Sequence, residues 1–168
     1  SNIEISDNFF DGVLAFGDAS NFFNILISNN IFNNVGAFGK INFSGAAGFS
    51  NVTIQNNILF GPIYALIATN AVIANNVFVN TPNAFQNYVS NLTTNAIIRD
   101  NIFYNSNPTN NTVGCSYLNN LSFNTSSTYA AMPGTGNIDN TNPNFINVIS
   151  GTYSTSFNFH LQGGSPAI

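Results

Sequence analysis

The chain has 168 residues, enough for one domain with a buried core, and 5% of them are charged, against about a quarter in an average protein. Lys40 and Arg99 are its only cations and the net charge is −4. A phosphate backbone is bound by clustered basic residues, so this composition excludes nucleic acid as a partner. No apolar run approaches the roughly 20 residues of a membrane-spanning helix, so we expect no membrane span.

A short motif, two apolar strands around a polar turn, occurs six times in the first 123 residues. The first copy is Ile3-Glu4-Ile5-Ser6-Asp7-Asn8-Phe9-Phe10. The second turn residue is an asparagine in all six copies, and the intervals between these asparagines are 22, 27, 19, 25 and 19 residues. A unit of fixed length joined by loops of variable length is typical of a solenoid, in which each coil stacks on the next.

The alternation of side chains indicates which positions of the motif face inward. The residues five and three before the asparagine are mostly apolar and lie on one face of a strand, because successive side chains point to opposite faces. The residue two after the asparagine is also apolar in five copies. Stacking the coils places equivalent side chains on one another and builds a continuous core, which no single coil could bury alone.

The repeated asparagine stands between apolar positions, where an unpaired polar side chain would be costly. If the coils stack in register, each side-chain amide can donate to the carbonyl oxygen of the asparagine in the adjacent coil. We also expect a left-handed backbone at this bend, which asparagine tolerates. The predicted structural ladder consists of Asn8, Asn30, Asn57, Asn76, Asn101 and Asn120.

The remaining segments complete the predicted domain. Four β-like runs, at 13–16, 40–43, 63–67 and 85–89, lie between copies of the motif and predict a third strand in those coils. After residue 123 the pattern weakens: 124–136 is rich in Ser, Thr, Gly and Pro and predicts a long loop, whereas 137–139 and 144–148 resume a coil. We therefore predict regular coils over 1–123, and a long loop and closing segment of the same domain over 124–168.

The repeated I-x-I-x-[ND]-N-x-F pattern resembles the β-helix repeat of the pectate-lyase-like superfamily. The end of the chain resembles a C-terminal motif that is common in secreted bacterial members: Asn142-Pro143-Asn144-Phe145, then Phe159-His160-Leu161-Gln162-Gly163-Gly164-Ser165-Pro166-Ala167-Ile168. The resemblance covers nearly the whole chain and implies an all-β, right-handed parallel β-helix of about six to seven coils, located outside the cell or on its surface. It implies no single activity, because the superfamily includes lyases, hydrolases, adhesins and phage spikes.

Candidate catalytic residues are few. Polysaccharide lyases of this superfamily use a Lys or Arg base, for which the chain offers only Lys40 and Arg99. Arg99 should face outward beside the turn residue Asp100, which favours an ordinary surface pair, and Lys40 has no acidic neighbour in sequence. His160 has no partner in a known catalytic arrangement, and Cys115 occupies an inward position that favours a buried thiol over a reactive one.

Four of the six acidic residues fall within the first eighteen residues. Carboxylates of this group, Asp7, Asp11 and Asp18, have the hard oxygen ligands that Ca²⁺ prefers. Against a metal site, Asp7 occupies the turn position and Glu4 faces outward by alternation. We therefore expect no cofactor, with Ca²⁺ at these residues as the alternative.

Two surfaces are candidates for association. Leu26, Val72, Ile97 and Leu118 occupy outward positions and form a possible interface, unless loops such as 124–136 cover them. The first strand begins without a visible cap, and an open strand edge can pair with another chain, which favours stacking of copies end to end.

Three functions remain open. The first is a secreted or cell-surface structural or adhesive module, whose partners are copies of itself or the rest of a larger surface protein; the scarcity of catalytic groups favours it. The second is a polysaccharide lyase or glycoside hydrolase, complete or a fragment, that acts on acidic glycans. The third is a glycan-binding module without catalysis, which uses outward Tyr64, Tyr88 or Tyr104.

Overall fold

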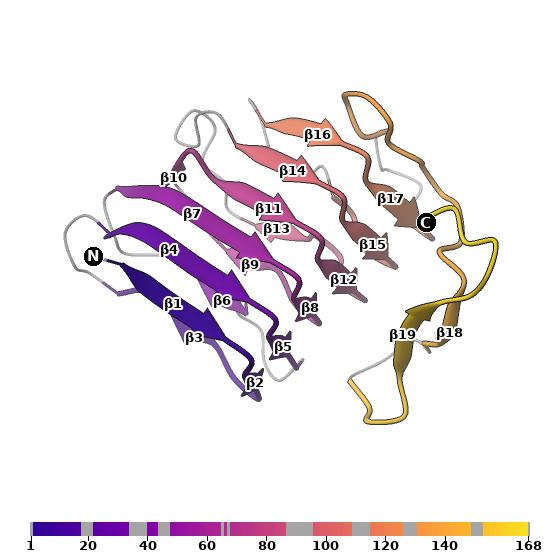
Figure 1. The fold of residues 1–168 in the computed structure, drawn as a ribbon, viewed down its shortest axis with the longest axis horizontal. Helices are drawn as coiled ribbons and strands as arrows, with labels where there is room; N and C mark the ends of the chain where they lie inside the picture. The colour runs from indigo at the N-terminus through magenta and orange to yellow at the C-terminus, as the bar shows by residue number, and fades with distance from the viewer. Residues whose placement is uncertain are drawn as a thin grey trace.

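The structure is a computed structural model that describes residues 2–17, 22–33, 40–43, 48–64, 66, 68–86, 96–108, 115–125, 131–148 and 153–167. Within these residues all regular structure is β, with nineteen strands. Most strands run parallel and stack coil upon coil, so the described chain forms a parallel β-helix (Figure 1). None of the described segments is a helix of the length and apolarity needed to cross a membrane.

Sheet A contains the strand that precedes each asparagine turn. Its six stacked strands pair the equivalent positions of successive motifs, such as Ile5 with Ile27 and Ile73 with Ile98. A short seventh strand, β10 (Ala68–Thr69), pairs with the first half of β7. The stacked strands are β1 (Ile3–Ser6), β4 (Phe22–Ser28), β7 (Phe49–Gln55), β11 (Val72–Ala74), β14 (Ile97–Arg99) and β16 (Ser116–Leu118).

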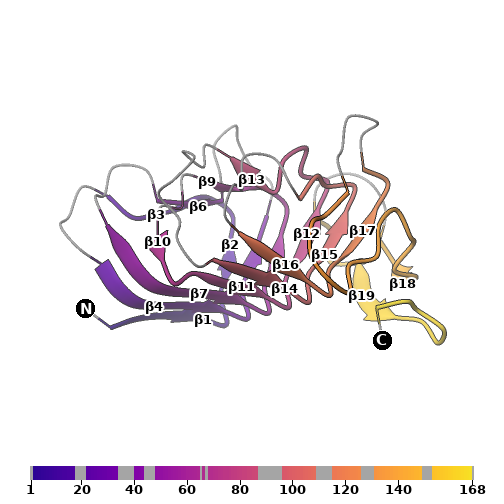
Figure 2. The ribbon, with the colours of Figure 1, turned by 90° about the horizontal axis from the view of Figure 1, so that it is seen from above.

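Sheet B follows the turn and sheet C supplies the third side of the coil (Figure 2). The strands of sheet B are β2 (Phe9–Phe10), β5 (Ile31–Phe32), β8 (Ile58–Leu59), β12 (Val77–Val79), β15 (Ile102–Tyr104) and β17 (Leu121–Phe123). Those of sheet C are β3 (Leu14–Ala15), β6 (Ile41–Asn42), β9 (Ile63–Tyr64) and β13 (Phe85–Gln86), within the four runs predicted as third strands.

The predicted fold class is confirmed, but the described residues form about four complete turns rather than the six to seven predicted. All three sheets are present in about four turns. Sheets A and B continue for two further rungs, and single bridges from Leu118 to Thr135 and from Leu121 to Ile138 begin a seventh. The difference arises because the motif reports only sheets A and B, whereas a complete turn also needs a strand in sheet C.

The inward positions of the motif form the core, as predicted. Ile27, Ile54 and Phe103 are fully buried, and rings of successive coils stack face to face in the interior. The centroids of Phe78 and Phe103 lie 5.0 Å apart with planes 14° from parallel. Such offset or stacked pairs add to the stability that burial of the rings already provides.

The asparagine ladder is present and its hydrogen bonds follow one scheme. The backbone N–H and the Nδ2 of Asn57 both donate to Oδ1 of Asn76, at 3.0 Å each, and Nδ2 of Asn57 also donates to the Ile27 carbonyl of the preceding coil. The left-handed backbone lies one residue earlier than predicted, at the residue before the ladder asparagine, with φ between 53° and 60°. These turn residues are Asp7, Asn29, Asn56, Asn75, Asp100 and Asn119.

Two further asparagine ladders run along other corners of the coil. In one, Asn51 Nδ2 donates to Asn24 Oδ1 at 3.0 Å, and Asn24 Nδ2 donates to Asn2 Oδ1 at 3.0 Å. In the other, Asn105 Nδ2 donates to Asn80 Oδ1 at 2.8 Å. Asn24, Asn51, Asn80 and Asn105 all have left-handed backbone, so each ladder marks a bend.

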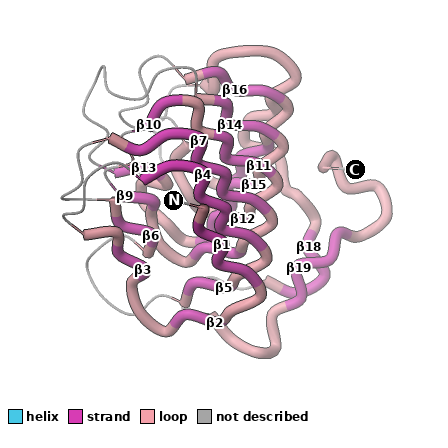
Figure 3. The backbone as a smooth tube through the Cα atoms, turned by 60° about the vertical axis from the view of Figure 1, so that its left-hand side comes forward, coloured by secondary structure: helices cyan, strands magenta, loops and turns pink. Residues whose placement is uncertain are grey.

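The C-terminal segment departs from the helical winding. β18 (Phe145–Asn147) and β19 (Asn158–Leu161) form an antiparallel hairpin that lies beside sheet B (Figure 3). Its aromatic rings pack on outward side chains of that sheet: the ring of Phe145 lies 5.7 Å from Tyr104 and the ring of Phe159 6.1 Å from Phe60. Phe60 points outward and is nevertheless only 1% exposed, because this segment covers it.

Candidate functional site

The structure places the two candidate bases on different sheets. Arg99 ends β14 on the outer face of sheet A, and its Nη1 lies 2.6 Å from Oδ2 of Asp100 in a partly exposed ion pair. This is the local surface pair that the sequence favours. Lys40 directly precedes β6 in sheet C, so the arrangement does not bring the two cations together.

Lys40 is fully buried, and its Nζ atom makes no hydrogen bond to any residue that the structure describes. Its stem lies against Gly61, where any Cβ would clash with it. Burial lowers the pKa of the Lys40 ammonium from its ordinary 10.5, and the negative charge of Asp11 acts in the opposite direction. The sequence gives no signal of this burial, because a lysine between loops normally keeps its ammonium in water.

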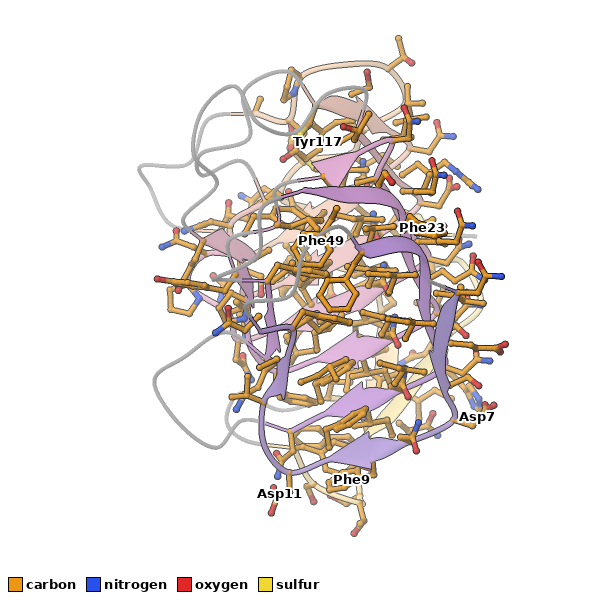
Figure 4. The ribbon with its side chains drawn as sticks, turned by 90° about the vertical axis from the view of Figure 1, so that its left-hand side faces the viewer. Asp7, Phe9, Asp11, Phe23, Phe49 and Tyr117 are labelled. Atoms are coloured by element: carbon orange, nitrogen blue, oxygen red, sulfur yellow. The ribbon has the colours of Figure 1, made fainter. Side chains whose placement is uncertain are left out.

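The acidic residues of the first coil do not converge. Asp7 lies in the turn before β2 and Asp11 lies just after it, at opposite ends of the strand (Figure 4). Asp11 instead accepts a hydrogen bond from Asn33 Nδ2 at 2.7 Å. Asp18 lies outside the described residues. Among the residues that the structure does describe, no three acidic, histidine or cysteine side chains are grouped to hold a metal ion.

Neither the cysteine nor the histidine belongs to a catalytic arrangement in the described part of the chain. Cys115 packs against the hydrophobic core, and burial raises the pKa of its thiol to about 11. A thiol with this pKa is almost entirely protonated at neutral pH and is a poor nucleophile. His160 is exposed on the hairpin strand β19.

The predicted apolar interface on sheet A is discontinuous. Leu26, Val72 and Leu118 are partly buried, and Ile97 is 37% exposed. Thr53 separates Leu26 from Val72 in the register of the sheet. Val72 and Ile97 are neighbours in the register, whereas Leu26 and Leu118 stand apart from them, so this face does not carry one continuous apolar stripe.

The tyrosines proposed for glycan contact differ in their surroundings. Tyr64 points outward from sheet C, where it stands in register between Asn42 and Gln86. Tyr104 packs between Phe123 and Phe145, which makes it part of the contact with the hairpin. Tyr88 lies outside the described residues.

A cavity of about 320 Å³ lies at the corner between sheets A and B, over the last rungs of the ladder. We call it the corner cavity. Its polar wall includes the turn residues Asn75, Asp100 and Asn119, and its apolar wall includes Ile102 and Leu121. Pro166 and Ala167 close it from the end of the chain, which lies beside β17 (Figure 1). The repeat alone could not reveal this site, because its two sides are far apart in sequence.

The two ends of the β-helix differ. At the first coil, β1, β2 and β3 each pair on one side only within the described residues, and Phe9 and Val13 are 54% and 42% exposed. The ring of Phe9 lies 5.4 Å from that of Tyr153, and Phe23 of β4, 45% exposed, lies on a different side of the coil from Phe9 (Figure 4). At the other end, Met132 inserts into the core cluster and is 5% exposed.

Comparisons with known proteins found no match: no protein-family model fits the chain, and neither a curated protein nor a solved structure is significantly similar to it. The fold assignment therefore rests on the strand register and the ladder described above. The chain is a parallel β-helix whose coils are joined by an asparagine ladder.

Proposed function

We propose that the chain is a structural module of the secreted, pectate-lyase-like type, which acts outside the cell and associates with copies of itself. The observation that carries the proposal is the open end of the β-helix, where β1, β2 and β3 each pair on one side only within the described residues and Phe9 and Val13 of the first coil are exposed. Unpaired strand edges beside exposed apolar side chains are typical of a surface that binds another chain.

The difference between the two ends favours contact between the first coils of two copies. Asn8 Oδ1 faces this end and accepts no hydrogen bond among the described residues, whereas Oδ1 of Asn30 accepts two from Asn8. At the opposite end the last ladder residue, Asn137, is satisfied within its own loop, because its Nδ2 donates to the Pro133 carbonyl at 3.1 Å. A symmetric pair needs only one open surface, which both copies supply.

The low charge supports a structural role. Charged side chains are scarce, at 5% of residues, and the hydrogen bonds between coils come from backbone and asparagine amides. Within the described residues the candidate base Arg99 is paired with Asp100 and Lys40 is buried. These features favour a rigid scaffold over the second possibility, a lyase or hydrolase.

Light scattering after size-exclusion chromatography, over a range of protein concentrations, tests the proposal. We expect the wild type to form a concentration-dependent dimer and Phe9→Asp to shift it to monomer. Ile146→Asp is the matched control, because Ile146 is 52% exposed on the hairpin, away from the first coil. A wild type that stays monomeric throughout, or a dimer that both variants weaken equally, would overturn the proposal.

A second candidate function is glycan binding without catalysis. It is favoured by Tyr64, whose outward ring stands in register between the amides of Asn42 and Gln86 on sheet C. Aromatic rings flanked by amides suit a sugar ring with its hydroxyl groups. A glycan array with no hits for the wild type, or hits that persist in Tyr64→Ala, would remove this candidate.

A further inference from the structure

The corner cavity has a polar wall built from one column of the repeat. Asn75, Asp100 and Asn119 occupy the turn position of three successive rungs, with φ of 57°, 56° and 53°. Neighbouring parallel strands lie about 4.8 Å apart, so the three side chains are spaced by this distance along the corner. The common left-handed backbone directs all three side chains away from the core in the same way.

The side chains in this column have unused hydrogen-bonding capacity. Their backbone N–H groups donate to carbonyls of the next coil, for example Asn75 N to Arg99 O at 3.2 Å. The side-chain amides of Asn75 and Asn119 make no hydrogen bond to the residues that the structure describes, and Asp100 uses Oδ2 for Arg99. Two amides and one carboxylate oxygen therefore remain for a ligand.

The opposite wall is apolar and held in place. Ser165 is buried, and its Oγ donates to the Pro143 carbonyl at 2.7 Å and accepts the backbone N–H of Ala167 at 3.1 Å. This fixes Pro166 and Ala167 across the cavity from the turn column. Gly136, which also lines the cavity, holds the turn position of the next rung with φ of 71°, and any Cβ there would clash with Asn119 Oδ1.

The chemistry of these walls selects the ligand. Amides both donate and accept, and a carboxylate accepts from hydroxyl groups, whereas the apolar wall matches the C–H face of a ring. Arg99 neutralises Asp100, so the site has no net charge to attract an ion. A volume of about 320 Å³ is near the lower limit of ligand pockets, which suits a single small ring.

We propose that the corner cavity binds one unit of a neutral saccharide. Its hydroxyl groups bind the turn residues Asn75, Asp100 and Asn119, and the C–H face of its ring lies against Pro166 and Ala167. The Oδ1 atom of Asp100, whose other oxygen is held by Arg99, accepts from a hydroxyl group, and Asn75 and Asn119 bind on either side. The site is distinct from Tyr64 on sheet C and from the open strand edges of the first coil, so it does not depend on the proposed function.

Chemical-shift titration of the ¹⁵N-labelled chain with glucose, galactose, mannose and N-acetylglucosamine, each separately, tests the proposal. We expect at least one sugar to give saturable shifts confined to the corner cavity. Asn75→Gly and Asn119→Gly should each weaken binding at least about tenfold, as expected for loss of a hydrogen bond in a polar site. Glycine keeps the left-handed turn, so these variants remove the side chain without straining the backbone.

Asn56→Gly is the matched control, because Asn56 has the same turn conformation two rungs earlier than Asp100 and does not line the cavity. It should bind as the wild type does. Unchanged shifts away from the cavity verify that each variant is folded. The proposal is overturned if none of the four sugars shifts the cavity residues, if the shifts gather around Tyr64 instead, or if Asn56→Gly loses binding as Asn119→Gly does.

Discussion

The Nδ2 atom of Asn120 donates to the Oδ1 atom of Asn137 at 3.0 Å, which adds a seventh rung to the six that the repeat predicts. The interval of 17 residues is shorter than the others, and the preceding turn residue is Gly136, with φ of 71°. The rung thus keeps the left-handed turn and the asparagine although the surrounding motif has changed.

We expect Asn76→Ala to lower the free energy of unfolding by about 3 kcal/mol, because several buried partners lose their hydrogen bonds together. Asn76 Oδ1 accepts from the backbone N–H and Nδ2 of Asn57, and its Nδ2 donates to Ile54 O and Asn101 Oδ1. Urea unfolding followed by circular dichroism measures the change. In Asn56→Gly, which alters only the exposed turn residue, the loss should be within about 0.5 kcal/mol; equal losses in both variants would mean that the ladder is not the cause.

Gly134→Ala should destabilise the last rung by about 2 kcal/mol or more. Gly134 has φ of 107°, and a Cβ at this position would meet the carbonyl oxygen of Tyr117. Gly12→Ala provides the comparison, since a Cβ there has no atom within 4 Å. Thermal unfolding should show a lower midpoint for Gly134→Ala and little change for Gly12→Ala. A Gly134→Ala midpoint equal to the wild type would contradict the close packing of this loop on β16.

Lys40→Met should stabilise the fold by about 1–3 kcal/mol at neutral pH, because it replaces a buried ammonium that has no described partner by an apolar side chain of similar length. Chemical unfolding of wild type and variant measures the difference. A destabilised Lys40→Met would show that the ammonium has a favourable partner after all.

The advantage of Lys40→Met should depend on pH. Burial lowers the folded-state pKa of Lys40 below its ordinary 10.5, despite the charge of Asp11, so between the two pKa values the unfolded state binds more protons than the folded state. The wild type should therefore gain stability relative to the variant as pH rises across this interval toward 10.5, and the difference should be constant below it. If the stability advantage of Lys40→Met over the wild type instead grew with rising pH, a buried ammonium at Lys40 would be contradicted.

Cys115 should react slowly with a thiol reagent in the folded chain. Burial raises its pKa from 9.0 to about 11, which lowers the thiolate fraction about 100-fold at neutral pH. Alkylation with iodoacetamide, followed by mass spectrometry with and without denaturant, measures the ratio of rates. Equal rates in the two conditions would place the thiol in water rather than against the core.

The strand register could be predicted from the sequence because the asparagine marks the same point in every coil. Aligning the motifs on it pairs Ile27 with Ile54 and Ile73 with Ile98, as the structure does. The alternation of side chains then fixes the inner face without further information. Ala74 is one exception, an outward position that is nevertheless buried, because Gln55 and Arg99 flank this small side chain in register.

Features that depend on contacts between distant segments were not predictable. The hairpin of β18 and β19 covers Phe60 with rings that follow it by about a hundred residues, and no periodicity links them. The outer ladders through Asn51 and Asn105 are hidden because asparagine is frequent throughout the chain. The corner cavity likewise requires the chain end to meet the turn column.

Association of copies through the first coil, as proposed above, should be visible in hydrogen exchange measured at low and at high protein concentration. We expect the amides of residues 3–6 and 9–10 to exchange more slowly at high concentration, because their open strand edges become paired. Amides of residues 116–123, at the other end of the β-helix, should exchange at the same rate in both conditions. Equal exchange of residues 3–10 at both concentrations, or slowing that is confined to 116–123, would contradict it.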